Sequence, residues 1–249
     1  MFLVDYKKRL DEFDVCTSNL FGSQGFCDVE NGKIYKIYFN PKILKYDFSK
    51  FESKRIAFPY EYLYDVQQES CDKVIGEVMP YYNYKSIAWS IDDSIVVDKL
   101  KNHFSEMINE ITKYFQIRMI DLCTPNILYD KENGFILIDT TPWTISDNGK
   151  TNVDINTRCF EYALQDTILS DVLKLYLKVI YENEFTKNIK HYGNSGKELY
   201  DALCSSFMDD ECRIIEIIEM YKYIFANGEY GPIETLGDMK KYTKMLKNC

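Results

Sequence analysis

The first ninety residues gather aromatic and β-branched side chains into short runs that polar residues separate, which is typical of strands. Asn31-Gly32 lies between two of these runs and is the strongest short signal for a β-hairpin. Between the second and third runs, the apolar residues have a spacing that suits a short helix. The sequence therefore predicts strands over 26–30, 33–39, 58–64 and 74–79, and a helix over 42–56.

The pattern changes after Pro80. From residue 94 to about 116 apolar residues recur with the period of an amphipathic helix, and Asp92, Asp93 and Ser94 are available as caps. Two short apolar runs then flank a polar turn, and from about residue 160 onward the pattern is mostly helical. The predicted elements are helix 94–116, strands 127–129 and 135–138, and helices 164–184, 196–207, 211–226 and 233–246.

This order of elements predicts an α+β fold with two lobes. Residues 1–80 would form a small antiparallel sheet with one helix, and residues 81–249 a mainly helical lobe. A short link near 80–85 would join them, with a cleft between the lobes.

Composition and charge argue against several classes of function. The 249 residues are 46% hydrophobic and 28% charged, as in ordinary globular chains. A net charge of −9 without a dense Lys/Arg cluster argues against nucleic acid as a partner. Eight scattered cysteines without Cys-x-x-Cys spacing, and two histidines, argue against zinc and favour reduced thiols in a cytoplasmic protein. No signal peptide or run of about 18 apolar residues is evident, so a membrane association is not expected.

The segment from Met119 to Asp139 carries the most specific chemistry. Asn126 follows Asp121 by five residues, Asp139 follows Asn126 by thirteen, and each lies beside an apolar run typical of a strand. Phosphoryl transfer requires such a set, because one carboxylate orients the attacking hydroxyl while an amide and a second carboxylate bind Mg²⁺ on the nucleotide phosphates. Each of the three alone would more often be a turn residue or a cap, so the prediction depends on their combination.

A second candidate lies at Gly22-Ser23-Gln24-Gly25. Paired glycines let backbone amides approach phosphate oxygens, although such a segment is most often an ordinary turn. The hairpin that follows carries Lys36 between apolar neighbours, where an ammonium is costly to bury unless it meets an anion. The other interpretation is an alternating strand whose lysines and tyrosines face water.

In order and spacing these features resemble the protein-kinase superfamily over residues 20 to 143, and the chain looks like a compact bacterial kinase-like protein. The resemblance implies a two-lobed kinase-like fold that uses ATP and Mg²⁺. Asp121 would be the catalytic carboxylate and Lys36 would contact the α- and β-phosphates. Asn126 and Asp139 would bind the metal.

The resemblance also implies a partner for Lys36 and a site for the adenine. Glu52, on the predicted helix, would pair with Lys36, although a solvated helix charge fits the sequence equally well. The segment Met79-Pro80-Tyr81-Tyr82 would bind the adenine, and a strand end followed by a proline turn is the alternative.

The chain departs from the pattern of that superfamily at several positions. Met119-Ile120 replaces His-Arg, Thr140-Thr141 replaces Phe-Gly, and no Ala-Pro-Glu motif follows. These changes remain compatible with metal and nucleotide chemistry and weaken the expectation of a protein substrate.

Two functions from different classes follow. The first is a Mg-ATP-dependent phosphotransferase acting on a hydroxyl group of a protein or small molecule, and the alternative is a pseudokinase that works as a nucleotide-binding or partner-binding regulatory module. Transfer of a nucleotidyl group on the same fold is a third, weaker hypothesis. A polar stretch interpreted as a loop would either bind the acceptor or be a solvated connection; it contains Asp147, Asp154, Asn156 and Arg158.

Overall fold

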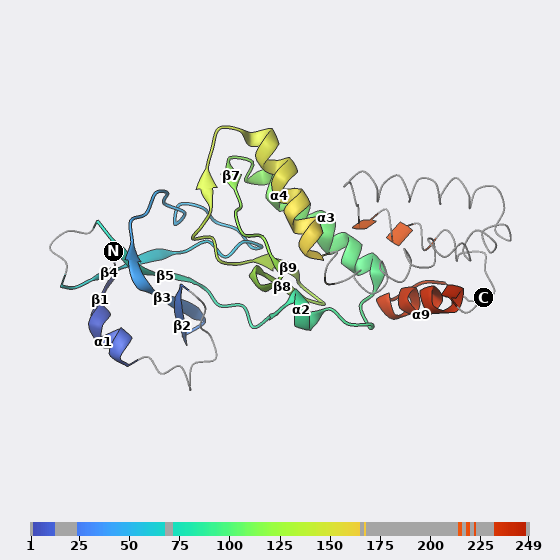
Figure 1. Ribbon diagram of the computed structural model, residues 1–249, viewed down its shortest axis with the longest axis horizontal. Coiled ribbons are helices and arrows are strands. Elements are labelled where there is room, and N and C mark those ends of the chain that lie inside the picture. The colour runs from blue at the N-terminus through green and yellow to red at the C-terminus, as the bar shows by residue number, and fades with distance from the viewer. Residues whose placement is uncertain are drawn as a thin grey trace. The chain divides into compact units, whose positions relative to one another are not determined.

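The protein is an α+β chain in which strands dominate the first part and helices follow (Figure 1). This computed structural model describes residues 2–12, 24–67, 72–164, 167, 214–215, 218–219, 222 and 232–247. Gly22, Ser23 and nearly all of the predicted helices over 164–184, 196–207 and 211–226 lie outside the described residues. The α+β class predicted from the sequence is confirmed.

Contacts divide the chain into two compact units. The first unit comprises residues 1–84, 116–121 and 136–149, and the second unit comprises residues 85–115, 122–135 and 150–249. The first unit therefore contains Lys36, Asp121 and Asp139, whereas Asn126 belongs to the second unit.

The first unit is built on a five-stranded sheet with strand order β1-β4-β5-β3-β2. β1 runs parallel to β4, and the other neighbours are antiparallel. The sheet is thus mixed rather than purely antiparallel. Its strands are β1 (Phe2–Val4), β2 (Gly25–Glu30), β3 (Lys33–Lys42), β4 (Glu61–Asp65) and β5 (Val74–Pro80).

The hairpin predicted at Asn31-Gly32 is present. Both residues have positive φ, 51° and 73°, as the two central residues of a type I′ turn require. One face of the resulting sheet is buried around Phe26, Ile37 and Leu63. β1 and the short helix α1 (Tyr6–Asp11) were not predicted; the Tyr6 hydroxyl of α1 lies 2.8 Å from the carbonyl oxygens of both Tyr38 and Phe39.

The helix predicted over 42–56 is wrong, because β3 extends to Lys42 and the following residues are irregular. Side chains take the place of helical hydrogen bonds here. The Phe48 N–H donates to the Tyr62 hydroxyl at 3.0 Å, and Ser53 Oγ accepts from two backbone N–H groups. Two of the apolar residues that gave the helical spacing, Phe48 and Phe51, join an aromatic cluster instead, in which the ring of Phe48 packs on Phe51 and Phe58.

Two later segments complete the first unit. β7 (Ile117–Arg118) pairs antiparallel with β10 (Thr144–Ile145). Leu137 accepts a hydrogen bond from the Ala57 N–H and donates one to the Arg55 carbonyl, at 2.8 and 2.9 Å. These bonds anchor the chain two residues before Asp139.

The second unit holds the long helix α3 (Val97–Lys113), close to the predicted 94–116. Its N-cap is Val96, which provides no side-chain hydrogen bond, so the caps predicted at residues 92–94 are wrong. Asp92 instead accepts hydrogen bonds from Ser94 and Lys131. The other elements are β6 (Lys85–Ser86), α2 (Ile87–Ser90), η1 (Thr124–Asn126), β8 (Ile127–Asp130), α4 (Gly149–Leu164) and α9 (Leu236–Lys247). β9 (Gly134–Leu137) begins in the second unit, and its residues 136 and 137 belong to the first.

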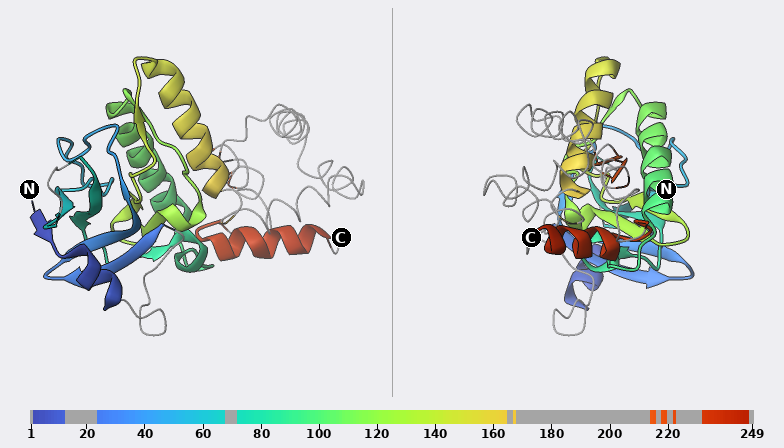
Figure 2. Two further views of the ribbon diagram at one scale, coloured as in Figure 1. Left: turned by 60° about the vertical axis from the view of Figure 1, so that its left-hand side comes forward. Right: turned by 90° about the vertical axis from the view of Figure 1, so that its right-hand side faces the viewer.

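The helix α4 occupies the stretch that the sequence indicated as a polar loop. Figure 2 shows α4 beside α3, and the ring of Phe160 packs on Phe104 with centroids 5.6 Å apart. Asn152 and Asn156 face the interior of the unit, and Asn152 donates to the Phe115 carbonyl at 3.1 Å. Since amides occupy two core positions, hydropathy alone conceals this helix.

Two further facts concern the described residues as a whole. None of their helices combines the length and apolar character that crossing a bilayer requires. Their three cysteines, Cys27, Cys123 and Cys159, are not in disulfides.

Candidate functional site

Lys36 and Glu77 form a cross-strand ion pair in the first unit. They lie directly opposite each other on β3 and β5, so their side chains project to the same face of the sheet. Lys36 Nζ is 3.5 Å from Glu77 Oε1, and the two residues are 9% and 1% exposed. Burial of either charge would be costly without the other.

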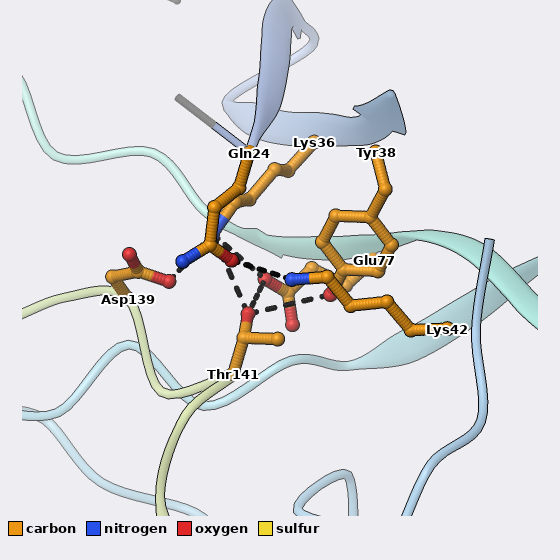
Figure 3. Close-up of polar contacts among 7 residues, drawn as sticks. All are labelled: Gln24, Lys36, Tyr38, Lys42, Glu77, Asp139 and Thr141. Carbon is orange, nitrogen blue, oxygen red and sulfur yellow. Dashed lines mark hydrogen bonds and ion pairs between the residues drawn. The ribbon is translucent and has the colours of Figure 1, made fainter. Parts of the chain in front are cut away.

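Asp139 and Thr141 complete this arrangement from the segment after β9 (Figure 3). Lys36 Nζ donates to Asp139 Oδ1 at 2.5 Å and lies 3.4 Å from Thr141 Oγ1. The Thr141 hydroxyl donates to Glu77 Oε1 at 2.7 Å. The Tyr38 hydroxyl lies 3.3 Å from Thr141 Oγ1. We call these five residues the Lys36 cluster.

The Lys36 cluster keeps its lysine charged. Burial alone would lower the pKa of Lys36, but the charges of Glu77 and Asp139, with the hydrogen bond from Asp139, outweigh burial and raise it. Burial, followed by the charge of Glu77, raises the pKa of Tyr38. Burial also raises the pKa of the neighbouring Cys27 thiol to about 11, which keeps that thiol protonated at neutral pH. The cluster therefore presents one ammonium and two carboxylates without a reactive thiolate.

Close backbone approaches at two glycines shape the sheet around Lys36. A Cβ on Gly76 would lie 2.2 Å from the Lys36 carbonyl oxygen, and a Cβ on Gly25 would lie 2.1 Å from the Ile37 carbonyl oxygen. Only glycine fits either position. Gly25 is thus explained by packing within the hairpin, which leaves the predicted phosphate contact of its loop a prediction.

Gln24, which precedes Gly25, contacts a second lysine. Lys42 Nζ donates to Gln24 Oε1 at 2.5 Å and lies 4.3 Å from the centroid of the Tyr38 ring (Figure 3). The contact connects the described end of the Gly22–Gly25 segment to the last residue of β3.

Asp121 and Asp139 share an uncommon backbone conformation. Their φ angles are +64° and +59°, in the left-handed region that residues with a side chain rarely occupy. Asp139 is 24% exposed at its side chain and Asp121 is exposed on the turn after β7. Asp121 is not a hydrogen-bond or ion-pair partner of Lys36. Such strain is concentrated at functional sites, so it favours a role for both residues.

Asn126 ends the 3₁₀ turn η1 in the second unit. Its backbone N–H donates to the Cys123 carbonyl at 2.9 Å, and Pro125 lies within the turn. The turn fixes the backbone of Asn126 immediately before β8.

The predicted adenine segment begins at the end of β5. Met79 is 5% exposed and pairs with Ile34 of β3, while Pro80 is the last residue of the strand. Tyr81 is 38% exposed, and Tyr82 packs on Tyr84 with ring centroids 5.7 Å apart.

The prediction that Glu52 pairs with Lys36 is wrong. Glu52 lies in the irregular segment after β3, and the carboxylates that pair with Lys36 are Glu77 and Asp139. Glu77 was missed, although it is the one charged residue in the apolar run Val74–Met79 and so carried a signal of its own. Tyr38, Lys42 and Thr141 carried no comparable signal, because their roles depend on strand register and on tertiary packing.

Comparisons with known proteins add little at the level of sequence. No family model matches the chain, and no curated protein matches it. Among solved structures, the chain is similar to the Rio2 kinase–ADP/Mg²⁺–phosphoaspartate complex from Chaetomium thermophilum, with 13% identity and a TM-score of 0.37. The match covers 65% of the present chain and 58% of that chain. Similarity at this level defines neither a family nor a reaction for the present protein.

Proposed function

We propose that the protein is a kinase-like, Mg-ATP-dependent phosphotransferase that acts on a hydroxyl group of a protein or small molecule. The observation that carries the proposal is the position of Lys36, whose ammonium is buried between Glu77 and Asp139. A buried lysine bonded to a partly exposed carboxylate offers adjacent groups of opposite sign. One attracts phosphate oxygens and the other attracts a divalent cation.

The residues present fit a magnesium-bound nucleotide by the chemistry of their donors. Asp139 and Asn126 would provide the oxygen ligands that Mg²⁺ prefers, and the bound ion would neutralise charge on the phosphates. Lys36 would hold the phosphate chain, with Glu77 orienting its ammonium. Asp121 would accept a hydrogen bond from the acceptor hydroxyl and take its proton. Met79, Pro80, Tyr81 and Tyr82 would bind the adenine, and Gly22, Ser23, Gln24 and Gly25 the phosphates.

Mass spectrometry of acceptor mixtures incubated with ATP and Mg²⁺ tests the reaction. Asp121→Asn and Asp139→Asn are the informative variants, because asparagine tolerates the left-handed backbone at both positions. We expect Asp121→Asn to reduce transfer at least about 100-fold, the usual order for loss of a general base. Asp139→Asn should also reduce transfer, because an uncharged amide binds Mg²⁺ less strongly than a carboxylate. Asp72→Asn, at an exposed position of the first unit, is the matched control and should retain activity. Transfer that persists unchanged in Asp139→Asn contradicts the proposal, and an added AMP in place of phosphate changes the reaction class.

The second candidate function is a pseudokinase, a nucleotide-binding or partner-binding regulatory module. The 2.5 Å contact between Lys36 Nζ and Asp139 favours it, because a carboxylate held by a lysine is less available to a metal ion. A pseudokinase would bind nucleotide or a partner protein without transferring phosphate. Binding of ATP together with an absence of transfer to any acceptor in the same preparation would support this alternative.

A further inference from the structure

The first unit contains a cavity of about 180 Å³ that adjoins the Lys36 cluster. Residues 42–46, 48 and 141–144 form most of its lining, and Glu77 and Thr141 belong to both the cavity and the cluster. A cavity of about 150 Å³ is enough to hold benzene. The space therefore suits a molecule with one aromatic ring and a small substituent.

Aromatic side chains held in fixed positions line the cavity: Tyr46, Phe48, Tyr62 and Trp143. The Phe48 N–H bonds to the Tyr62 hydroxyl at 3.0 Å, and Phe58 stacks on Phe48 at an interplanar angle of 14°. The same Phe58 ring meets Trp143 edge to face at 87°. Walls of this kind favour a planar ring over a flexible chain.

Two lysines of the lining have no carboxylate partner among the described residues. Lys42 bonds to the neutral amide of Gln24 and lies over Tyr38, and Lys45 lies 5.3 Å from the centroid of the Tyr46 ring. Burial and the nearby Lys36 lower the pKa of Lys42. An anion bound beside Lys42 would favour its charged form and so offset the effects of burial and of Lys36 on its pKa.

Glu77 is the single acidic residue of the lining, and it shares the ammonium of Lys36 with Asp139. Its Oε1 accepts the Thr141 hydroxyl and lies 3.5 Å from Lys36 Nζ. The lining itself carries two lysines, Lys42 and Lys45, and one carboxylate, Glu77.

We propose that this cavity binds a small aromatic carboxylate. Its ring would lie among Phe48, Tyr62 and Trp143, and its carboxylate would lie at Lys42 and Lys45. The proposal is independent of phosphotransfer, because it requires neither nucleotide nor metal.

Fluorescence of Trp143 provides the test. The chain has two tryptophans, and Trp89 is 82% exposed, so Trp89→Phe leaves Trp143 at the cavity as the single reporter. Benzoate should change its emission saturably below about 10 mM, an affinity within reach of one ring and one ion pair. Benzamide, which lacks the charge, and cyclohexanecarboxylate, which lacks the aromatic ring, should each bind about tenfold more weakly.

Lysine variants made in the Trp89→Phe protein show which lysines bind the carboxylate of benzoate. Lys42→Met and Lys45→Met keep the aliphatic stem and should each weaken benzoate binding about fivefold to tenfold. Lys45 is exposed, so its variant should fold even if Lys42→Met does not. Lys33→Met is the matched control, since Lys33 lies over the ring of Tyr60 outside the cavity. The proposal is overturned by no saturation with benzoate, by equal binding of benzamide, or by unchanged affinity in Lys45→Met.

Discussion

At the scale of single residues, the two carboxylates that the sequence selected for chemistry share a strained backbone. Asp121 and Asp139 both have φ near +60°, which costs roughly 1–2 kcal/mol for a residue with a Cβ. Aspartate and asparagine bear this cost better than other residues, because their short polar side chains bond to the local backbone. The strain therefore restricts which substitutions these positions accept, apart from any catalytic need.

Substitutions at Asp121 separate strain from chemistry. Asp121→Asn should leave the free energy of unfolding within about 0.5 kcal/mol of wild type, whereas Asp121→Val should lower it by roughly 1–2 kcal/mol, because a β-branched residue resists positive φ. Urea denaturation measures both. The same pair at Asp147, which lacks positive φ, should differ much less. Equal effects of asparagine and valine at Asp121 would contradict this interpretation.

The free energy of unfolding should depend on pH through the protonation of Lys36. The pKa of Lys36 in the folded protein is raised above the ordinary value of 10.5, so the charged lysine contributes stability that is fully present below pH 10.5. That contribution is lost as pH rises through the folded pKa. Lys36→Met leaves Glu77 buried without its cation and should cost about 3 kcal/mol at pH 7. The difference from wild type in denaturant melts should stay flat from pH 7 to 9 and shrink above 10.5; a difference that grows with pH would contradict the assignment.

At the scale of elements, the approach of β5 to β3 determines where Lys36 and Glu77 meet. Gly76 pairs with Ile37, and a Cβ there would lie 2.2 Å from the Lys36 carbonyl oxygen. Gly32 in the hairpin turn has φ +73° but open space around the missing Cβ. The two glycines are therefore required for different reasons, one steric and one conformational.

Alanine at these two glycines should reveal the difference. Gly32→Ala should lower the free energy of unfolding by about 1 kcal/mol, the cost of positive φ alone. Gly76→Ala should cost more than about 3 kcal/mol, because backbone of the adjacent strand must move. Chemical denaturation gives both values, and amide NMR shifts of β3 should move in Gly76→Ala only. If Gly76→Ala were as mild as Gly32→Ala, the close contact between β5 and β3 would be wrong.

At the scale of the whole molecule, the sequence predicted elements whose signals are local. The hairpin, α3 and the strands around residues 127–138 follow from turn chemistry and hydrophobic period, which depend on neighbours in sequence. The helix over 42–56 was wrong, since side chains from Tyr62 and Ser53 satisfy the backbone there. α4 was missed because Asn152 and Asn156 occupy core positions. Local patterns cannot reveal either of these tertiary effects.

The candidate site shows the same difference between local signals and tertiary effects. The sequence selected Lys36 and Asp139 from motif spacing, and the structure brings them to 2.5 Å. From the sequence, Glu52 was predicted as the partner of Lys36, whereas the register of β3 and β5 places Glu77 there. A cross-strand partner depends on which strands are neighbours, and the order β1-β4-β5-β3-β2 is not encoded by spacing along the chain.

Thermal stability of the whole chain then gives the most direct test of the nucleotide site. A ligand that binds only the folded state raises the melting temperature by mass action, with about 2.7 kcal/mol gained at 100 times its Kd. ATP with Mg²⁺ should therefore stabilise the wild type more than ATP alone. Asp139→Ala should lose the magnesium-dependent part, because it removes the proposed metal ligand. Asp147→Ala should keep the full shift, which controls for the loss of one negative charge from a chain of net charge −9. A magnesium-dependent shift that survives in Asp139→Ala would place the metal elsewhere, whereas no shift in the wild type would leave Lys36 and Asp139 as a structural ion pair.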